Sequence, residues 1–188
     1  MRTKLILFLP LLAVLAVSSG CVASRTPVGD KVAALEPKIW NGKWRDGDGG
    51  VVTTKIKDAR VGIVRMTNKA AWLKRGETHE ILVRMLGPLT IANEEMGGGY
   101  GFGRVVNDGT HLVVFGADRS VFERLIKRHE IAGEIERDKQ RKPTGACSIE
   151  GLSRKDYQRL KNEGFDVRSL FEEDPSTVLV RDKWMPIW

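Results

Sequence analysis

The chain has 188 residues, a formal net charge of +7 and 41% hydrophobic residues. This length is enough for one domain with a hydrophobic core. The positive excess is modest, and there is no long basic stripe with interleaved aromatic residues, so the composition does not predict a nucleic-acid-binding protein. An excess of this size favours solubility and is compatible with contact to anionic lipid or polysaccharide.

The amino terminus has the order of a signal peptide. Arg2 and Lys4 are followed by an apolar run of thirteen residues, 5–17, broken only by Pro10. The run is too short to cross a hydrocarbon core, which needs about 20 residues. A charged start followed by a short apolar run therefore predicts a signal peptide over residues 1–20.

The residues that follow this run suggest lipid attachment. Ser18, Ser19 and Gly20 precede Cys21, an order that resembles the bacterial lipobox, in which small residues precede an invariant cysteine. The resemblance implies cleavage after Gly20, diacylglycerol on Cys21 and a further acyl chain, often palmitate, on the new amino terminus. Ser18 stands where the pattern favours leucine. The alternative is an ordinary signal peptide with a cysteine near its end.

Acylation would hold the protein on a membrane without spanning it, because two or three acyl chains together bind a bilayer stably. Val22 follows Cys21 where an aspartate would favour retention in the inner membrane, so the resemblance implies the outer membrane, facing the periplasm. Residues 21–37 contain small, polar and proline residues without a sustained period, which predicts a flexible tether. Residues 38–188 are then expected to form one globular domain.

The chain between residues 39 and 118 has the pattern of β-strands separated by turns. Alternating or short apolar runs predict strands at residues 51–57, 60–66, 80–85, 100–106 and 111–115. The strongest hairpin signal is Asn107-Asp108-Gly109, between the last two of these runs. Short spacings between strands predict antiparallel pairing, since parallel crossovers need more residues.

Helical periodicity begins at Ser120. Glu123 follows it at capping-box spacing, and Phe122, Leu125, Ile126 and His129 share a helical face. A return to strand is expected at residues 131–135.

Ser153 with Asp156 predicts a second capped helix, which Gly164 ends. Asp166 is expected to cap a further short turn, and residues 177–180 to form a final strand. The sequence therefore predicts an α+β fold: a curved antiparallel sheet or partial β-barrel with two or three short helices late in the chain.

The most unusual stretch is the glycine-rich run at residues 97–103. It lacks the spacing of a dinucleotide-binding fingerprint and the lysine of a phosphate-binding loop. One interpretation is a turn leading into a closely packed strand. The other is a glycine flap in which Tyr100 and Phe102 line a ligand pocket.

Other chemistry-bearing residues form no recognisable set. The three histidines, His79, His111 and His129, show no metal-ligand spacing, and no cofactor motif is present. Glu134 and Glu136 would share a face of a strand, where a carboxylate pair could do acid–base work, although exposed edge charges are far more common. Cys147 is expected to be buried.

Asn41-Gly42-Lys43-Trp44 resembles the G-x-W signature that opens the first strand of lipocalins. The resemblance implies that Trp44 plugs the closed end of a barrel and that the ligand is a lipid or a small apolar molecule. The family's central T-D-Y element is absent, and the helix predicted at Ser120 falls where a lipocalin barrel would still run strands.

Three functions remain open from the sequence. The leading hypothesis is a membrane-anchored envelope lipoprotein that acts as a non-enzymatic binding or interaction module, with an envelope protein as partner. The second is a lipocalin-like carrier of a lipid or small apolar ligand, with Trp44, Tyr100 and Phe102 as candidate ligand contacts. The third is an envelope-modifying enzyme, for which Glu134 and Glu136 offer the only hint.

Overall fold

The structure is a computed structural model that describes residues 22–69 and 76–182. The predicted signal peptide and Cys21 lie outside the described residues. The strands are β1 (Val22–Ser24), β2 (Lys31–Val32), β3 (Gly42–Arg45), β4 (Val51–Asp58), β5 (Ile63–Lys69), β6 (Glu77–Leu86), β7 (Leu89–Met96), β8 (Gly99–Asn107), β9 (His111–Gly116), β10 (Gly133–Arg137), β11 (Pro143–Ile149) and β12 (Thr177–Arg181). The helices are α2 (Pro37–Trp40), α3 (Arg119–Lys127), α4 (Arg154–Asn162) and the short 3-10 helix η1 (Val167–Leu170).

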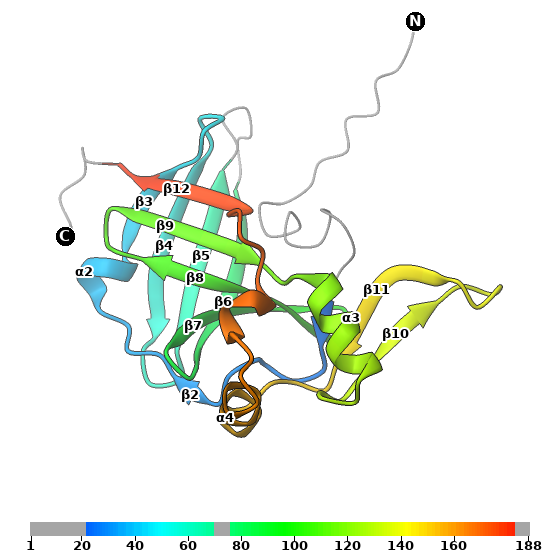
Figure 1. The fold of residues 1–188 in the computed structure, drawn as a ribbon. Coiled ribbons are helices and arrows are strands. Elements are labelled where there is room, and N and C mark those ends of the chain that lie inside the picture. The colour runs from blue at the N-terminus through cyan, green and yellow to red at the C-terminus, as the bar shows by residue number, and fades with distance from the viewer. Residues whose placement is uncertain (1–21, 70–75, 183–188) are drawn as a thin grey trace, which may run out of the picture.

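Eight of these strands form a closed antiparallel barrel (Figure 1). Strands β3 to β9 each pair with the next along the chain, and β12 closes the ring by pairing with both β9 and β3. The prediction of a mostly antiparallel sheet accompanied by helices is confirmed, and eight strands close into a full barrel where a curved sheet or partial barrel was expected. Closure removes the two exposed edges that an open sheet of this kind would leave.

The barrel has its own hydrophobic core. Every second side chain of a barrel strand points inward, so on β4 Val52 and Thr54 are buried while Lys55 and Lys57 are exposed. The buried residues of this core are Ala33, Leu35, Trp40, Trp44, Val52, Val64, Met66, Ile81, Val83, Ala92, Val105, Leu112, Val114 and Leu179.

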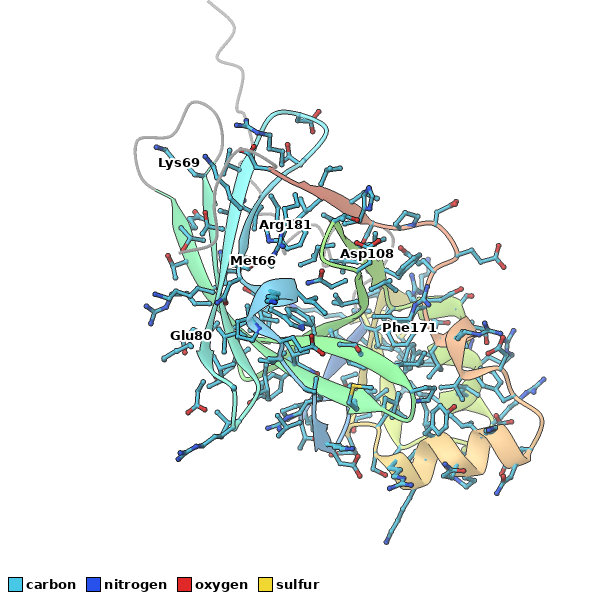
Figure 2. All side chains as sticks on the ribbon, turned by 90° about the vertical axis from the view of Figure 1, so that its left-hand side faces the viewer. Met66, Lys69, Glu80, Asp108, Phe171 and Arg181 are labelled. Carbon is cyan, nitrogen blue, oxygen red and sulfur yellow. The ribbon has the colours of Figure 1, made fainter. Side chains whose placement is uncertain are left out.

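A second core lies on the outer side of β7 and β8, where α3, α4, η1, β1 and β11 cover the barrel wall. Phe102 of β8 is in edge-to-face contact with Phe122 of α3 and with Phe171, at ring-centroid distances of 5.6 and 6.5 Å. Figure 2 shows Met66 on the barrel side of the molecule and Phe171 on the side that carries the helices. The same strands therefore wall two cores, one on each face.

The segment expected to be a tether is part of this fold. β1 pairs in parallel with β11 and antiparallel with β8, and β2 pairs with β6. Val28 is fully buried, and the buried Asn93 side chain accepts from its amide at 2.7 Å and donates to its carbonyl at 3.1 Å. Residues 22–37 are therefore not a separate tether, because Val22 and Val28 belong to the second core and Ala33 and Leu35 belong to the barrel core.

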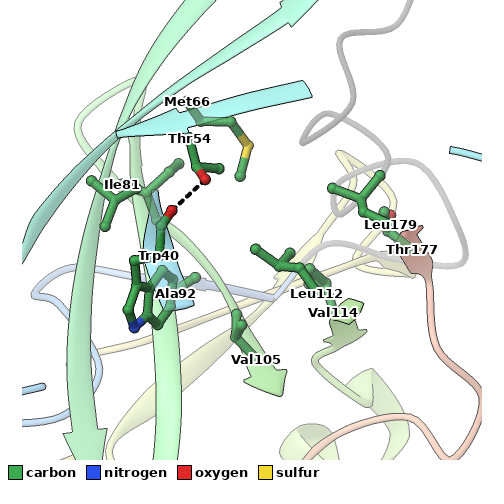
Figure 3. Close-up of a pocket in the computed structure, with 11 residues that line it drawn as sticks. Trp40, Thr54, Met66, Ile81, Ala92, Val105, Leu112, Val114, Thr177 and Leu179 are labelled. Atoms are coloured by element: carbon green, nitrogen blue, oxygen red, sulfur yellow. Dashed lines mark hydrogen bonds between the residues drawn. The ribbon is translucent and has the colours of Figure 1, made fainter. Parts of the chain in front are cut away.

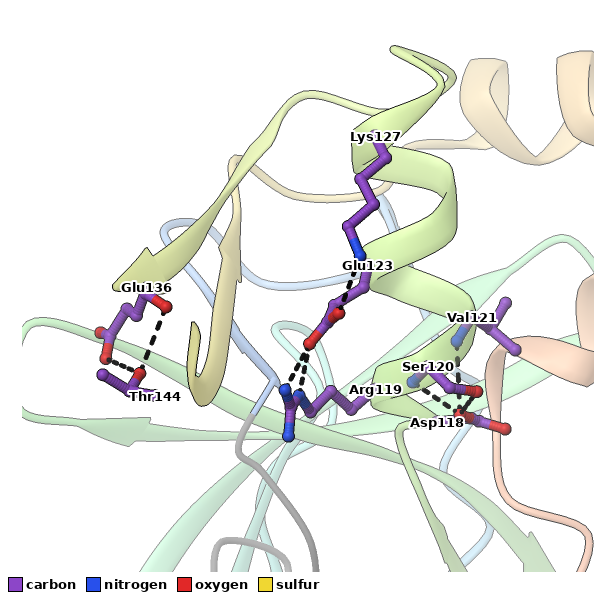
Figure 4. A network of polar contacts seen from close by, with 8 residues as sticks. All are labelled: Asp118, Arg119, Ser120, Val121, Glu123, Lys127, Glu136 and Thr144. Atoms are coloured by element: carbon purple, nitrogen blue, oxygen red, sulfur yellow. Dashed lines mark hydrogen bonds and ion pairs between the residues drawn. The ribbon is translucent and has the colours of Figure 1, made fainter. Parts of the chain in front are cut away.

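The helices differ from expectation in two details. α3 is capped by Asp118, whose carboxylate accepts from the amides of Ser120 and Val121, so the helix begins before Ser120 (Figure 4). Glu123 instead pairs with Arg119 and Lys127 along the helix. α2 precedes the barrel strands, so not all helices lie late in the chain.

Other expectations are confirmed. α4 carries the predicted capping box of Ser153 and Asp156, and Gly164 has the left-handed conformation (φ 82°) that ends it. Helices α3, α4 and η1 and strands β10 and β11 all lie between β9 and β12. The chain thus leaves the barrel after its seventh strand, builds the second core, and returns to supply the strand that closes the ring.

Candidate functional site

The barrel encloses a narrow apolar cavity (Figure 3). Side chains from α2 and from seven of the eight barrel strands line it. They are Trp40, Thr54, Val64, Met66, Ile81, Ala92, Val105, Leu112, Val114, Thr177 and Leu179. The two threonines bring the only hydroxyl groups among these lining residues. The wall therefore offers an apolar molecule a favourable surface and offers water few hydrogen-bond partners.

The cavity is small. Its volume is about 30 Å³. One water molecule needs roughly 10–15 Å³ on this measure, so the cavity has room for about two. An eight-stranded barrel has an interior just wide enough for side chains to fill it or for one small ligand. A slender ligand can enter by displacing an adaptable side chain, and Met66 is the unbranched, flexible residue in this wall.

A polar network fixes the end of the barrel at which α2 lies. The Trp44 indole donates to the Thr54 hydroxyl at 2.8 Å, and that hydroxyl donates to the Trp40 carbonyl. The Arg181 guanidinium lies over the Trp44 ring, 4.9 Å from its centroid, and donates to the carbonyls of Lys38, Ile39 and Asn41 at 2.8, 3.2 and 2.6 Å. The network ties α2 to β3, β4 and β12, and Trp40 becomes the floor of the cavity.

Two titratable side chains point inward nearer the opposite end, which carries the β7–β8 turn. His79 shares the inner face of β6 with Ile81, and Glu94 shares that of β7 with Ala92. The His79 Nδ1 and a Glu94 carboxylate oxygen are 2.6 Å apart. The Glu94 residue is only 8% exposed.

Sequence reasoning did not find this pair. His79 has no metal-ligand spacing in the sequence, and no sequence pattern assigns a role to Glu94. The usable signal was the period-two pattern that connects His79 to Ile81 and Val83 on β6. The pairing itself depends on strand register, which brings residues from two different runs of sequence together.

The predicted ligand contacts have other positions. Trp44 is fully buried at the α2 end of the barrel but does not line the cavity. Phe102 lies in the second core, outside the barrel, and Tyr100 shares that outer face of β8. Strand alternation explains the difference, because residues 101, 103 and 105 are the ones that face inward. Tyr100 and Phe102 are therefore not contacts of the barrel cavity.

The glycine-rich run forms the β7–β8 turn and the start of β8. Gly97 and Gly98 have φ values of 56° and 96°, which a turn between these strands requires and which glycine adopts without strain. This confirms the interpretation as a turn leading into a strand. In β8 itself Gly101 faces inward, and a Cβ there would lie 3.0 Å from the Met96 sulfur.

The remaining candidate residues lie outside the barrel, on β10 and β11. Glu134 and Glu136 are exposed, and the Thr144 hydroxyl contacts Glu136 at 3.4 Å (Figure 4). Cys147 is buried, as expected, and burial raises the pKa of its thiol to about 11, with the Glu123 charge adding to the effect. Within residues 22–69 and 76–182, no group of three potential ligands is arranged to hold a metal ion.

In the described part of the chain, no helix has both the length and the apolar character needed to span a bilayer. Comparison of the chain with protein-family models, curated proteins and solved structures gives no match. The barrel interior, with its apolar cavity and inward-facing His79–Glu94 pair, is thus the candidate functional site on the geometry of the chain itself.

Proposed function

We propose that this chain is a lipid-anchored, non-enzymatic binding protein of the bacterial envelope whose barrel takes one slender apolar ligand. The observation that carries the binding function is the cavity inside the barrel, with its almost wholly apolar wall. Burial of apolar ligand surface in such a wall contributes about 25 cal/mol per Å². The G-x-W resemblance at Gly42 and Trp44 points to the same class of function.

The anchor is proposed from the sequence. The order of charged, apolar and small residues before Cys21 supports lipidation at that cysteine, on the outer membrane facing the periplasm. A chain held at a membrane surface in this way would meet apolar molecules where they are concentrated. Metabolic labelling with an alkyne fatty acid tests the anchor: label is expected on the wild-type protein and lost in Cys21→Ser, and label retained in that variant would contradict it.

Filling the cavity tests the binding function. Ala92 lines the wall and is buried, so Ala92→Leu places three additional carbon atoms in a space of about 30 Å³. Val178, 44% exposed on the outer face of β12, gives the matched control Val178→Leu. Titration calorimetry with heptyl methyl ether, a slender apolar probe, is expected to show binding to the wild type and to Val178→Leu.

Ala92→Leu is expected to abolish that binding while the protein stays folded. Equal binding of the ether to all three proteins would place its site outside the barrel and contradict the proposal. If Ala92→Leu unfolds the protein, Val105→Leu, which adds one methylene to the same wall, gives the same test with less overpacking.

A further inference from the structure

We infer that the His79–Glu94 pair is the polar end of the ligand site, and that it selects an apolar molecule with a hydroxyl head. This inference rests on the proposed function, because it assigns a head-group contact to a ligand whose tail occupies the barrel cavity. It adds the chemical class of the ligand, which the cavity alone leaves open.

The position of the pair relates it to the cavity. In the strand register His79 lies directly opposite Met66, and Glu94 lies directly opposite Ile81. Met66 and Ile81 both line the cavity. Inward-facing neighbours on one strand are about 7 Å apart, because each residue advances roughly 3.3 Å. The pair therefore borders the apolar wall at the end opposite the Trp40 floor.

The hydrogen bonding of the pair leaves one group unused. Nδ1 of His79 contacts Glu94 at 2.6 Å, a distance typical of a charge-assisted hydrogen bond, which fixes the ring and leaves Nε2 for another partner. Nε2 is buried and makes no hydrogen bond with any described residue. A buried ring nitrogen without a partner costs free energy, which a ligand group at that position would recover.

The surrounding charges indicate which head group fits. A Glu77 carboxylate oxygen lies 3.9 Å from Nε2, and Glu94 is on the other side of the ring. Neither acid forms an ion pair with a lysine or arginine of the described residues. A ligand carboxylate would meet two like charges here, so a free fatty acid is disfavoured. An ammonium head would bring a full charge into a partly apolar site, at a cost that a hydroxyl does not incur.

A hydroxyl suits both protonation states of the ring. It donates to Nε2 when the imidazole is neutral and accepts from Nε2–H when the imidazole is protonated. The residue opposite His79 in the strand register is Met66, whose flexible side chain can shift to admit a head group. The ligand is thus a slender alcohol, with its hydroxyl at His79 and its alkyl chain directed toward Trp40.

Three probes of equal length test this inference: octanol, heptyl methyl ether, which lacks the donor, and octanoate, which carries the charge. The protein is the mature chain, residues 21–188 with Cys21→Ser, since both hydrophobic cores lie within it. In calorimetry at mildly alkaline pH, octanol is expected to bind about tenfold more tightly than the ether, because a neutral imidazole Nε2 needs a hydrogen-bond donor, which the ether lacks. Octanoate is expected to bind more weakly than the ether.

A double variant locates the preference. His79→Leu with Glu94→Leu removes both partners together, so that neither is left buried and unpaired. This variant is expected to bind the ether as the wild type does and to lose the tenfold preference for octanol. The control is Thr67→Val with Thr78→Val. These two threonines lie on the outer face of β5 and β6, and their hydroxyls are 3.1 Å apart. It is expected to keep the preference.

The outcomes separate the two proposals. Binding of ether and octanol with equal affinity by the wild type would overturn the assignment of His79 and leave the cavity as a site for apolar tails. Tighter binding of octanoate than octanol would also overturn it. Failure of the wild type to bind any of the three probes would overturn the proposed function itself. The comparison among probes needs no variant, so it holds even if the double variant does not fold.

Discussion

Replacement of Arg181 by methionine is expected to destabilise the barrel more than any comparable surface change. Methionine retains an apolar side chain of similar reach but removes the guanidinium that donates to the carbonyls of Lys38, Ile39 and Asn41 and lies over Trp44. Each hydrogen bond from a charged donor contributes about 1.5–3 kcal/mol, but these carbonyls can regain water. The contact with the indole ring adds about 0.5–2 kcal/mol.

Allowing for that rehydration, we expect a loss of about 3 kcal/mol in the free energy of unfolding. For a chain of this size the melting temperature should fall by about 10 °C. The matched control is Arg45→Met on β3, which breaks the ion pair of Arg45 with Asp182 at 3.0 Å. Arg45 is half exposed and Lys43 remains 3.9 Å from the Asp182 carboxylate, so the loss of this ion pair is expected to cost less than the loss of the Arg181 contacts.

Urea denaturation of residues 21–188 carrying Cys21→Ser measures both losses. Native-state hydrogen exchange should also show faster exchange of the Trp40 and Asn41 amides, which bond within and at the end of α2. Equal losses of stability in the Arg181 and Arg45 variants would refute the reasoning that Arg181 ties α2 to the barrel.

Three further results are expected. Asn93→Leu should lower the free energy of unfolding by about 3 kcal/mol or more in urea denaturation, because the buried amide and carbonyl of Val28 lose their hydrogen-bond partners. The segment around Val28 should then become sensitive to protease, and resistance equal to that of the wild type would contradict this. Cys147 should not react with iodoacetamide at mildly alkaline pH in the folded protein and should react once urea unfolds it, since its thiol pKa is about 11. Hydrogen bonds from Thr110 hold the pKa of Asp108 below its ordinary value of 3.8, so its contribution to stability is present above that value and is lost as the pH falls below it. Asp108→Ala should therefore weaken the acid dependence of stability, and an unchanged profile would count against this assignment.

Local signals in the sequence predict much of the fold. The turn at Asn107-Asp108-Gly109, the capping box of Ser153 and the stop at Gly164 involve residues close together in the chain. Their structures are set by short-range hydrogen bonds and by backbone conformation, which a single stretch of sequence specifies. The alternation within residues 51–57 and 100–106 likewise shows which residues share a face of a strand.

Long-range features are less visible. The alternation in β8 places Tyr100 and Phe102 on one face but does not say that this face lies outside the barrel. That depends on the helices inserted between β9 and β12, which cover β8 from outside. Similarly, β1 has only three residues, and its burial follows from its partners β8 and β11. The His79–Glu94 pair depends on the register between β6 and β7 in the same way.

The central claim is that the barrel holds an apolar tail, and a crystal structure with ω-bromo-octanol tests it most directly. Anomalous scattering locates the bromine atom without reference to any assumed pose. We expect the bromine inside the barrel, near Trp40, Leu112 and Leu179, with the hydroxyl within hydrogen-bonding distance of His79 Nε2. Bromine found only on the outer surface of the protein or in the second core would contradict the account.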